Sequence, residues 1–357
     1  MELLNLSNEM LDAIFAHIPF DVFYPRTIYG VMLTCRRLFD IAMPLLYSRL
    51  AFNFKNTGDK MVPYSSNPFN KYDKMLEVHP QRASWAVLAS FTYSWTRHDL
   101  WDNLASILPK LSLLQTLKIG AGLGHIDPFH DAIGLGINDC DRQTIIDGRD
   151  SKFIQLLKRC NHLHSLHTVC LMDRCITLQE ARAFFALPNI RVLEMRILDE
   201  IYSSFDEDLT LPEPSKLAVF KLVSEMLPSN RTAKRLFQGL SSLKDVYWST
   251  EETQPLYFFS FPWPPPQDHT WSPKDIEQAI YPCRNTLSRL QLYNNIPWQN
   301  IILPNIDFHE FSALTDLKLS ARLLFTMSLA SDLRGRRKGN RYDFAKRLPR
   351  NIEQLEL

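Results

Sequence analysis

The sequence predicts an α/β protein in which an N-terminal helical module is followed by an irregular solenoid of parallel strands. Within the head, residues 1–54, apolar residues recur at the three- and four-residue spacing of amphipathic helices. After residue 100, a sequence motif recurs that combines a helical segment, a short turn and leucines spaced two residues apart. Leucines at that spacing point to the same side of a strand. Because one such unit cannot bury its apolar face, neighbouring units must stack, with parallel strands and outer helices.

Two or three short helices are predicted in the head. The first begins near Ser7 or Asn8, whose side chains can cap it, and ends before Pro19. Its apolar stripe consists of Met10, Leu11, Ile14, Phe15 and Ile18. The second covers Ile28–Ala42 and is broken by Pro44. A piece this small buries its apolar side chains poorly, so the head is predicted to dock on another surface.

The order of residues in the head resembles an F-box. The most specific part is LTCRRLFDIAMPLLYSRL, which begins at Leu33 and closely follows the usual phrase of that family. Ser7 follows Leu6 where F-boxes carry a Leu-Pro pair, and a capping serine can replace a proline in the first turn. F-box helices pack on the Skp adaptor subunit of SCF-type ubiquitin ligases. By motif match, the resemblance implies adaptor binding by Leu6, Met10, Ile14, Val31, Cys35, Leu38, Pro44, Leu46 and Tyr47.

The phrase that recurs after residue 100 resembles a leucine-rich repeat. Six copies place apolar pairs on predicted strands: Leu117 and Ile119, Leu193 and Met195, Val246 and Trp248, Leu290 and Leu292, Leu317 and Leu319, and Leu355 and Leu357. A weaker copy lies in residues 156–171. The spacing is uneven, and of the intervals between strand leucines only Leu290 to Leu317 falls within the usual 20–29 residues. The repeat is therefore predicted to be irregular.

The expected domain division follows from these patterns. Residues 1–54 form the F-box-like head, residues 55–100 a connecting or first capping segment, and residues 101–357 the repeat domain. Insertions are expected near residues 120–150, 250–275 and 331–347. The chain ends within a copy of the repeat and without a polar capping unit, which predicts either truncation or an end covered by another element.

Two other architectures fit parts of the pattern. The head could be an ordinary helical cap of the repeat domain, because amphipathic helices commonly cap repeat proteins. Helices and strands also alternate in a doubly wound sheet. Short strands preceded by a corner leucine favour stacking over that second alternative.

Two of the insertions carry candidate partner-binding residues. Exposed aromatic side chains mark partner sites, and residues 255–267 hold Tyr257, Phe258, Phe259, Phe261 and Trp263 among prolines. The alternative is a loop folded back over the edge of the solenoid. Residues 332–350 are basic and include Arg336, Arg337 and Lys338. This second segment fits a nuclear-import signal or an anionic partner, or a solvated loop between repeats.

The insertion at residues 120–150 is rich in glycine and polar residues. Gly120, Gly122 and Gly124 follow a predicted strand, but His125 stands where a dinucleotide fingerprint needs its third glycine. The His and Asp residues at 125–131 offer metal donors, although such loops are usually solvated. The sequence therefore predicts no cofactor and no metal.

The composition and the absence of known catalytic motifs limit the functions that the sequence supports. With a formal net charge of +1 over 357 residues, the protein has no strong positive electrostatic field that would attract nucleic acid or a membrane surface. No apolar run approaches the ~20 residues that span a bilayer, and no secretory signal is visible. Six cysteines without a CxxC pair predict free thiols in a reducing compartment, the cytoplasm and/or the nucleus. No nucleophile elbow, zincin motif or complete phosphate loop is found.

The resemblance implies an adaptor and not an enzyme. An F-box followed by leucine-rich repeats, here with irregular spacing similar to fungal members, is typical of a substrate receptor of an SCF-type (cullin-RING) ubiquitin ligase. The head would bind the Skp adaptor and through it the cullin, and the repeats would bind a target protein. Such a subunit acts by raising the local concentration of its target near the ligase subunits. The alternative is an interaction scaffold outside any ligase, with the head as a cap.

Overall fold

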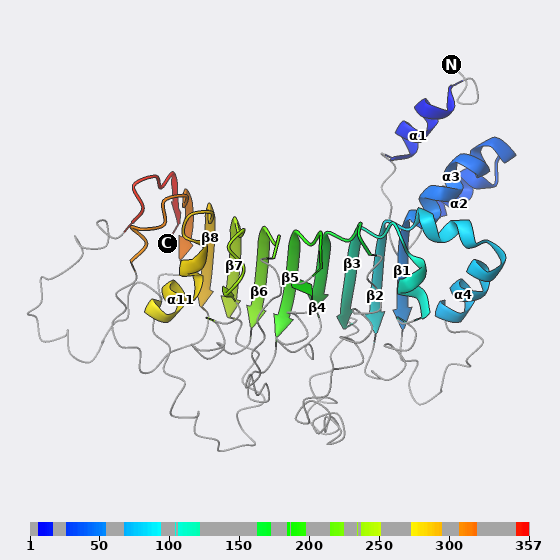
Figure 1. The fold of residues 1–357 in the computed structure, drawn as a ribbon. Helices are drawn as coiled ribbons and strands as arrows, with labels where there is room; N and C mark the ends of the chain where they lie inside the picture. Colours follow the sequence, from blue (N-terminus) through cyan, green and yellow to red (C-terminus); the bar gives the residue numbers. More distant parts are fainter. Residues whose placement is uncertain are drawn as a thin grey trace, which may run out of the picture. The chain divides into compact units, whose positions relative to one another are not determined.

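A computed structural model of the chain describes residues 6–16, 26–54, 68–93, 104, 106–121, 163–172, 184–185, 187–197, 215–224, 234, 237–250, 273–294, 307–319 and 348–356. Two compact units are present. Unit 1 consists of Met1–His125 and Lys152–Met172, and unit 2 of Ile126–Ser151 and Asp173–Leu357. Each unit combines a parallel sheet with short helices (Figure 1), which confirms the predicted α/β class.

The head, in unit 1, contains the helices α1 (Asn8–Ala16), α2 (Arg26–Met32) and α3 (Arg36–Ser48). Ser7, and not Asn8, caps α1: its hydroxyl oxygen accepts a hydrogen bond from the Met10 N–H at 3.3 Å, and its carbonyl accepts one from the Leu11 N–H at 3.0 Å. The described part of the first helix ends at Ala16, so the predicted stop at Pro19 lies outside the described residues.

The predicted second helix is wrong in two respects. A turn at Leu33 and Thr34 divides it into α2 and α3, and Pro44 lies inside α3 without ending the helix. A proline inside a helix costs about 3 kcal/mol, because it removes one hydrogen bond and crowds the preceding turn. Packing of Leu45 and Leu46 against the head core offsets this cost.

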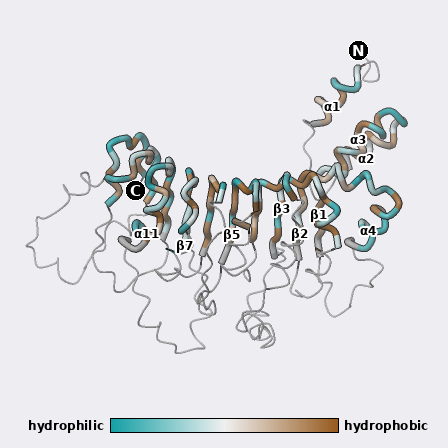
Figure 2. The backbone as a smooth tube through the Cα atoms, in the orientation of Figure 1, coloured by the Kyte–Doolittle hydropathy of each residue, from teal (hydrophilic) through white to brown (hydrophobic). Residues whose placement is uncertain are grey.

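The three head helices share a small apolar core. Its buried members come from all three helices: Leu11, Phe15, Ile28, Met32, Leu38, Ala42 and Met43. Hydrophobic residues are visible on α2 and α3 in Figure 2. Trp85, from outside the head, also packs against this core. The head is therefore an organised module that remains in contact with the segment after it.

The sheet of unit 1 begins inside the predicted head. Strand β1 (Arg49–Phe54) follows α3 directly and pairs in parallel with β2 (Leu88–Tyr93). Strand β2 pairs in parallel with β3 (Thr116–Ala121), and β3 pairs in parallel with β4 (Thr168–Met172). Helix α4 (Pro68–Val78) and the 3₁₀ helix η3 (Pro80–Trp85) connect β1 to β2, and η4 (Leu108–Lys110) precedes β3. Residues 49–54 and much of residues 68–93, predicted as head and connector, thus belong to one layered structure.

The sheet of unit 2 has six strands in chain order: β5 (Val192–Ile197), β6 (Val219–Ser224), β7 (Asp245–Thr250), β8 (Arg289–Asn294), β9 (Asp316–Leu319) and β10 (Gln354–Glu356). Each pairs in parallel with the next. Helix α11 (Pro273–Ile280) and η6 (Tyr281–Cys283) precede β8. Within the described parts of both units, strand order never reverses, unlike in a doubly wound sheet.

The same tight turn precedes strand after strand. The Leu114 N–H donates to the Leu111 carbonyl at 3.1 Å, and equivalent bonds link Leu166 to Leu163, Leu243 to Leu240 and Leu314 to Phe311. Both residues of each pair are buried and lead into a strand whose inward side chains alternate with outward ones. The corner leucines noted in the sequence therefore close the turns that align successive strands.

The predicted strands are present at all six clear copies and at the weaker one. Leu355 in β10 differs from the other central strand residues, because it is 42% exposed where a core position was expected. Strands β1, β2 and β6 were not predicted. In β6, the buried pair Phe220 and Leu222 has the expected two-residue spacing, but no leucine-rich phrase surrounds it.

Candidate functional site

The structure sorts the predicted adaptor-binding residues by burial. Leu38 belongs to the head core and is 4% exposed, so it could influence a partner only through the shape of the module. Pro44 is half-buried within α3. The half-buried residues that pack against the core are Leu6, Val31, Cys35, Leu46 and Tyr47. Met10 and Ile14 are 52% and 41% exposed.

Helix α1 presents a pair of apolar side chains to the exterior. Met10 and Ile14 are four residues apart, a spacing that places both on one face of the helix. Leu11 and Phe15, on the neighbouring face, are buried in the head core. Two faces of α1 are therefore apolar: one packs into the head core, and the other is exposed.

Sequence reasoning missed three exposed residues of the head. Tyr29 in α2 is 50% exposed, Leu33 in the following turn is 86% exposed and Phe39 in α3 is 39% exposed. Of the three, only Phe39 falls at the helical spacing of the predicted apolar stripe. The division into α2 and α3 places Leu33 in a turn, and no local sequence signal marks that division clearly.

Half of the exposed large apolar residues in the described chain lie in the head. The head contributes Met10, Ile14, Tyr29, Leu33 and Phe39, and the others are Val78, Val87, Leu113, Tyr281 and Leu355. The head is a small share of the described residues, so this surface is concentrated there. A module with this many exposed apolar side chains is a candidate for binding a partner.

Arg37 ties the start of α1 to α3. Its Nε donates to the Asn8 side-chain oxygen at 3.0 Å, and its Nη2 donates to the Leu6 carbonyl at 2.5 Å. Nearby, a hydrogen bond from the backbone, one from Ser7 and the Arg37 charge lower the pKa of Glu9. These contacts fix the helix that carries Met10 and Ile14 relative to the core.

Tyr47 faces the segment after the head and does not point freely outward. The Arg82 guanidinium lies 5.0 Å from the centre of its ring and donates from Nη1 to its hydroxyl at 3.1 Å. The Trp85 ring centroid is 6.2 Å from that of Tyr47. Tyr47 therefore joins α3 to η3, a structural role that the sequence did not indicate.

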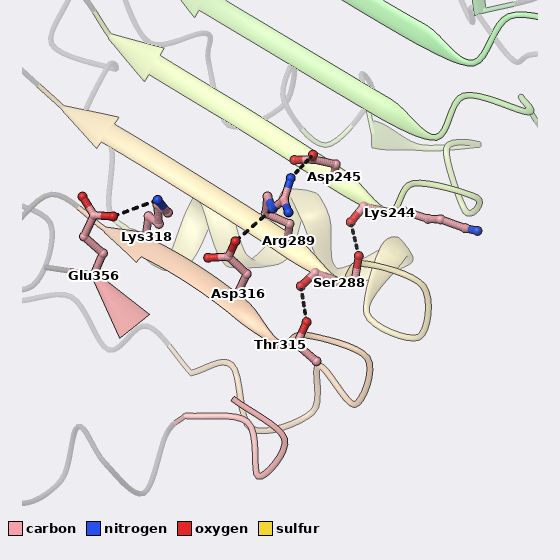
Figure 3. A network of polar contacts seen from close by, with 8 residues as sticks. All are labelled: Lys244, Asp245, Ser288, Arg289, Thr315, Asp316, Lys318 and Glu356. Carbon is pink, nitrogen blue, oxygen red and sulfur yellow. Dashed lines mark hydrogen bonds and ion pairs between the residues drawn. The ribbon is translucent and has the colours of Figure 1, made fainter. Parts of the chain in front are cut away.

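The outward face of the unit 2 sheet is polar and internally paired (Figure 3). Arg289 on β8 bridges Asp245 on β7 at 3.2 Å and Asp316 on β9 at 2.9 Å. Lys318 on β9 pairs with Glu356 on β10 at 2.8 Å. Opposite charges aligned across these strands pair with one another, so the described part of this face lacks the unbalanced charge of a nucleic-acid surface.

The two predicted partner-binding insertions cannot be placed. Tyr257, Phe258, Phe259, Phe261 and Trp263, and likewise Arg336, Arg337 and Lys338, lie outside the described residues. So do Gly122, Gly124, His125 and the acidic residues of the 120–150 insertion. Within the described chain, no group of three or more His, Cys, Asp or Glu residues could hold a metal ion.

Cys283 illustrates a buried thiol without reactive character. It is fully buried, and its Sγ donates to the Leu240 carbonyl at 3.2 Å. Burial raises the pKa of the Cys283 thiol from 9.0 to about 12. The thiolate, which is the nucleophilic form, is therefore suppressed in the folded protein.

Cys283 is expected to resist alkylation at pH 8.5 until the chain unfolds. Iodoacetamide labelling followed by peptide mass spectrometry, with and without urea, measures this protection. Because the folded pKa lies above 9.0, the unfolded state releases its proton first, and this residue lowers the free energy of unfolding as pH rises from 9.0 towards 12. Labelling of Cys283 at equal rates in both states would contradict its burial.

None of the helices in the described residues combines the length and apolar character needed to cross a bilayer. No protein-family model matches the chain, and a search of curated proteins likewise gave no significant match. The candidate site therefore has to be interpreted from its own geometry.

Proposed function

We propose that this chain is the substrate-recognition subunit of an SCF-type ubiquitin ligase, with the head bound to the Skp adaptor and the sheet-bearing remainder holding a target protein. The observation that carries the proposal is the set of exposed apolar side chains on a small module that already has its own core. In this function the chain performs no chemistry and brings a target close to the ligase subunits.

Met10→Asp is expected to abolish capture of the chain by the purified Skp adaptor. Binding would bury the new carboxylate in an apolar contact, at a cost of several kcal/mol. The variant should still fold, because Met10 is 52% exposed and lies in the first turn of α1, where the helix dipole favours negative charge. Co-purification of the full-length chain with the adaptor measures the effect.

Leu113→Asp is the matched control. Leu113 is 50% exposed, lies outside the head and follows η4 in unit 1. We expect this variant to bind the adaptor as the unaltered chain does. Failure of the folded, unaltered chain to bind the adaptor would refute the proposed function. Leu46→Asp is a poorer test, because Leu46 packs against the head core and its loss would also affect folding.

The second candidate is an interaction scaffold in which the head is only a cap. The observation in its favour is the direct junction of α3 and β1, since Arg49 both follows the last residue of the helix and begins the strand. Contact of Tyr47 with Trp85 and Arg82 adds to that junction. A cap needs no exposed apolar pairs, however, so adaptor binding separates the two candidates.

A further inference from the structure

In unit 2, a histidine and three carboxylates meet where α11 and η6 contact the segment before β9. His309 lies in that segment, residues 307–310, between two acidic neighbours. Its Nδ1 is 2.8 Å from Oδ1 of Asp307, and its Nε2 is 3.9 Å from Oε1 of Glu310. Glu277 on α11 provides the third carboxylate. The histidine ring therefore has a carboxylate next to each of its nitrogens.

Two hydrogen bonds join the 307–310 segment to α11 and η6. The Asp307 N–H donates to Oε2 of Glu277 at 2.7 Å, and the Tyr281 hydroxyl donates to Oε2 of Glu310. Within the segment, the His309 N–H donates to Oδ1 of Asp307 at 3.0 Å. None of these three donors is charged, so these bonds do not neutralise the carboxylates that they join.

The surroundings of His309 are mainly acidic. The titratable and charged groups on its own segment and on the elements next to it are Asp307, Glu310, Glu277, Tyr281 and Arg284. The Arg284 guanidinium lies over the Tyr281 ring, 4.3 Å from its centre. A hydrogen bond to Asp307, followed by the nearby carboxylate charges, raises the pKa of His309 above its usual 6.5.

Loss of a proton changes what the His309 ring offers to its neighbours. A protonated imidazole has two N–H donors, whereas a neutral one has one donor and one acceptor. If Nδ1 keeps its hydrogen towards Asp307, the lone pair of Nε2 faces the Glu310 carboxylate, which is unfavourable. The carboxylates also lose the positive charge beside them, so Glu277 on α11 and the acidic residues of the segment repel one another more strongly.

A buried aromatic pair depends on the same joint. Phe308 and Phe311 are 1% and 0% exposed, and their rings meet edge to face at 5.4 Å. The Tyr281 ring meets the edge of Phe311 at 6.4 Å. Because Tyr281 also donates to Glu310, separation of the segment from η6 would weaken an aromatic contact together with a polar one.

We propose that His309 is a proton-dependent clasp between residues 307–310 and the helices α11 and η6. In the protonated state, the ring links Asp307 to Glu310 and offsets the repulsion from Glu277. In the neutral state, the segment separates from α11 and η6 more often. The clasp is a pH-sensitive element of unit 2 and does not depend on adaptor binding by the head.

The sign of the pH dependence follows from the raised pKa of His309. Because the folded value lies above 6.5, the stabilisation is fully present below pH 6.5 and is lost as the pH rises through the folded pKa. The His309 side chain is 57% exposed, so solvent screens its ion pairs and the effect is local and modest.

Hydrogen exchange of the full-length chain, measured by mass spectrometry at about pH 6 and about pH 8, tests the clasp on both sides of the usual histidine range. After correction for the intrinsic pH dependence of exchange, residues 307–311 are expected to open about 2- to 5-fold more often at the higher pH, the range of exposed ion pairs. The turn at residues 240–243, which precedes β7 and contains no histidine, is the internal control.

Two variants of His309 separate its charge from its shape. His309→Arg keeps a positive charge at both pH values and should show slow opening at both. His309→Gln has a neutral side chain and should show fast opening at both. Glu356→Gln is the matched control, because it removes a carboxylate that pairs with Lys318 elsewhere in unit 2. It should retain the pH dependence of the unaltered chain.

Histidine NMR provides a second measurement. The His309 signal, assigned by its absence in His309→Gln, is expected to titrate above pH 6.5 and at a lower pH in Glu310→Gln than in the unaltered chain. Titration at or below pH 6.5 would refute the coupling to the carboxylates. Equal opening of residues 307–311 in the unaltered chain and in both His309 variants would refute the clasp. Neither failure affects adaptor binding, so each is distinct from a failure of the proposed function.

Discussion

Removal of residues 1–54 is expected to destabilise unit 1 by about 3–6 kcal/mol more than removal of residues 1–48. The two truncations differ by β1, which carries the buried side chains Leu50 and Phe52. Phe52 stacks on Phe91 of β2, with ring centroids 5.0 Å apart, and meets the edge of Tyr72 in α4 at 5.4 Å. Loss of β1 would also expose the edge of β2.

Urea denaturation of both truncated chains, followed by far-UV circular dichroism, measures this difference. Phe52→Ala in the full-length chain is the companion variant, because it removes the same aromatic contacts without exposing a sheet edge. Equal midpoints for the two truncations would mean that β1 contributes nothing to the sheet. A large difference would place the boundary of the head after Ser48.

Phe220→Ala is expected to lower the free energy of unfolding of unit 2 by about 3–5 kcal/mol, the usual cost of a phenylalanine-sized cavity in a packed core. Phe220 on β6 is fully buried. Its ring meets those of Phe185 and Phe237 edge to face, each at 5.8 Å, and Phe237 stacks on Trp248 at 5.9 Å. The substitution therefore removes one ring from a buried aromatic cluster that reaches from Phe220 on β6 to Trp248 on β7.

Phe39→Ala supplies the control for this substitution, since it deletes the same side chain from a position that is 39% exposed. We expect its effect on unfolding to stay within about 1 kcal/mol. Equilibrium urea unfolding, followed by far-UV circular dichroism, compares the two variants. Similar losses for both would contradict the central place of Phe220 in the core.

The two truncations bear on function as well as on stability. If the head ends at Ser48 and the sheet remains folded without it, the exposed apolar residues of α1, α2 and the turn at Leu33 are free to serve a partner. If the sheet requires the head for its stability, the cap interpretation gains support. Adaptor binding by the unaltered chain, and its loss in Met10→Asp, then decides between the candidates.

Local patterns in the sequence determined the class of the fold and most of its strands. Apolar residues two apart, preceded by an apolar corner residue, predicted β3, β5, β7, β8 and β9, because the period of a strand and the closure of a tight turn are local properties. The cap at Ser7 was readable for the same reason. Strand β6 was not predicted from the sequence, because no leucine-rich motif surrounds its buried pair, Phe220 and Leu222.

The candidate site depended on tertiary structure. Sequence spacing grouped Met10 with Leu11, and Leu38 with Phe39, although the first and last of these are exposed and the other two are buried. Which side chain faces the core depends on where α2 ends, on Arg37 holding α1 and on Tyr47 meeting Trp85. These contacts join residues about 30 to 40 positions apart, and no local pattern encodes them. The sequence by itself determined the repeating strands, and packing between distant segments decided which apolar residues remained available for a partner.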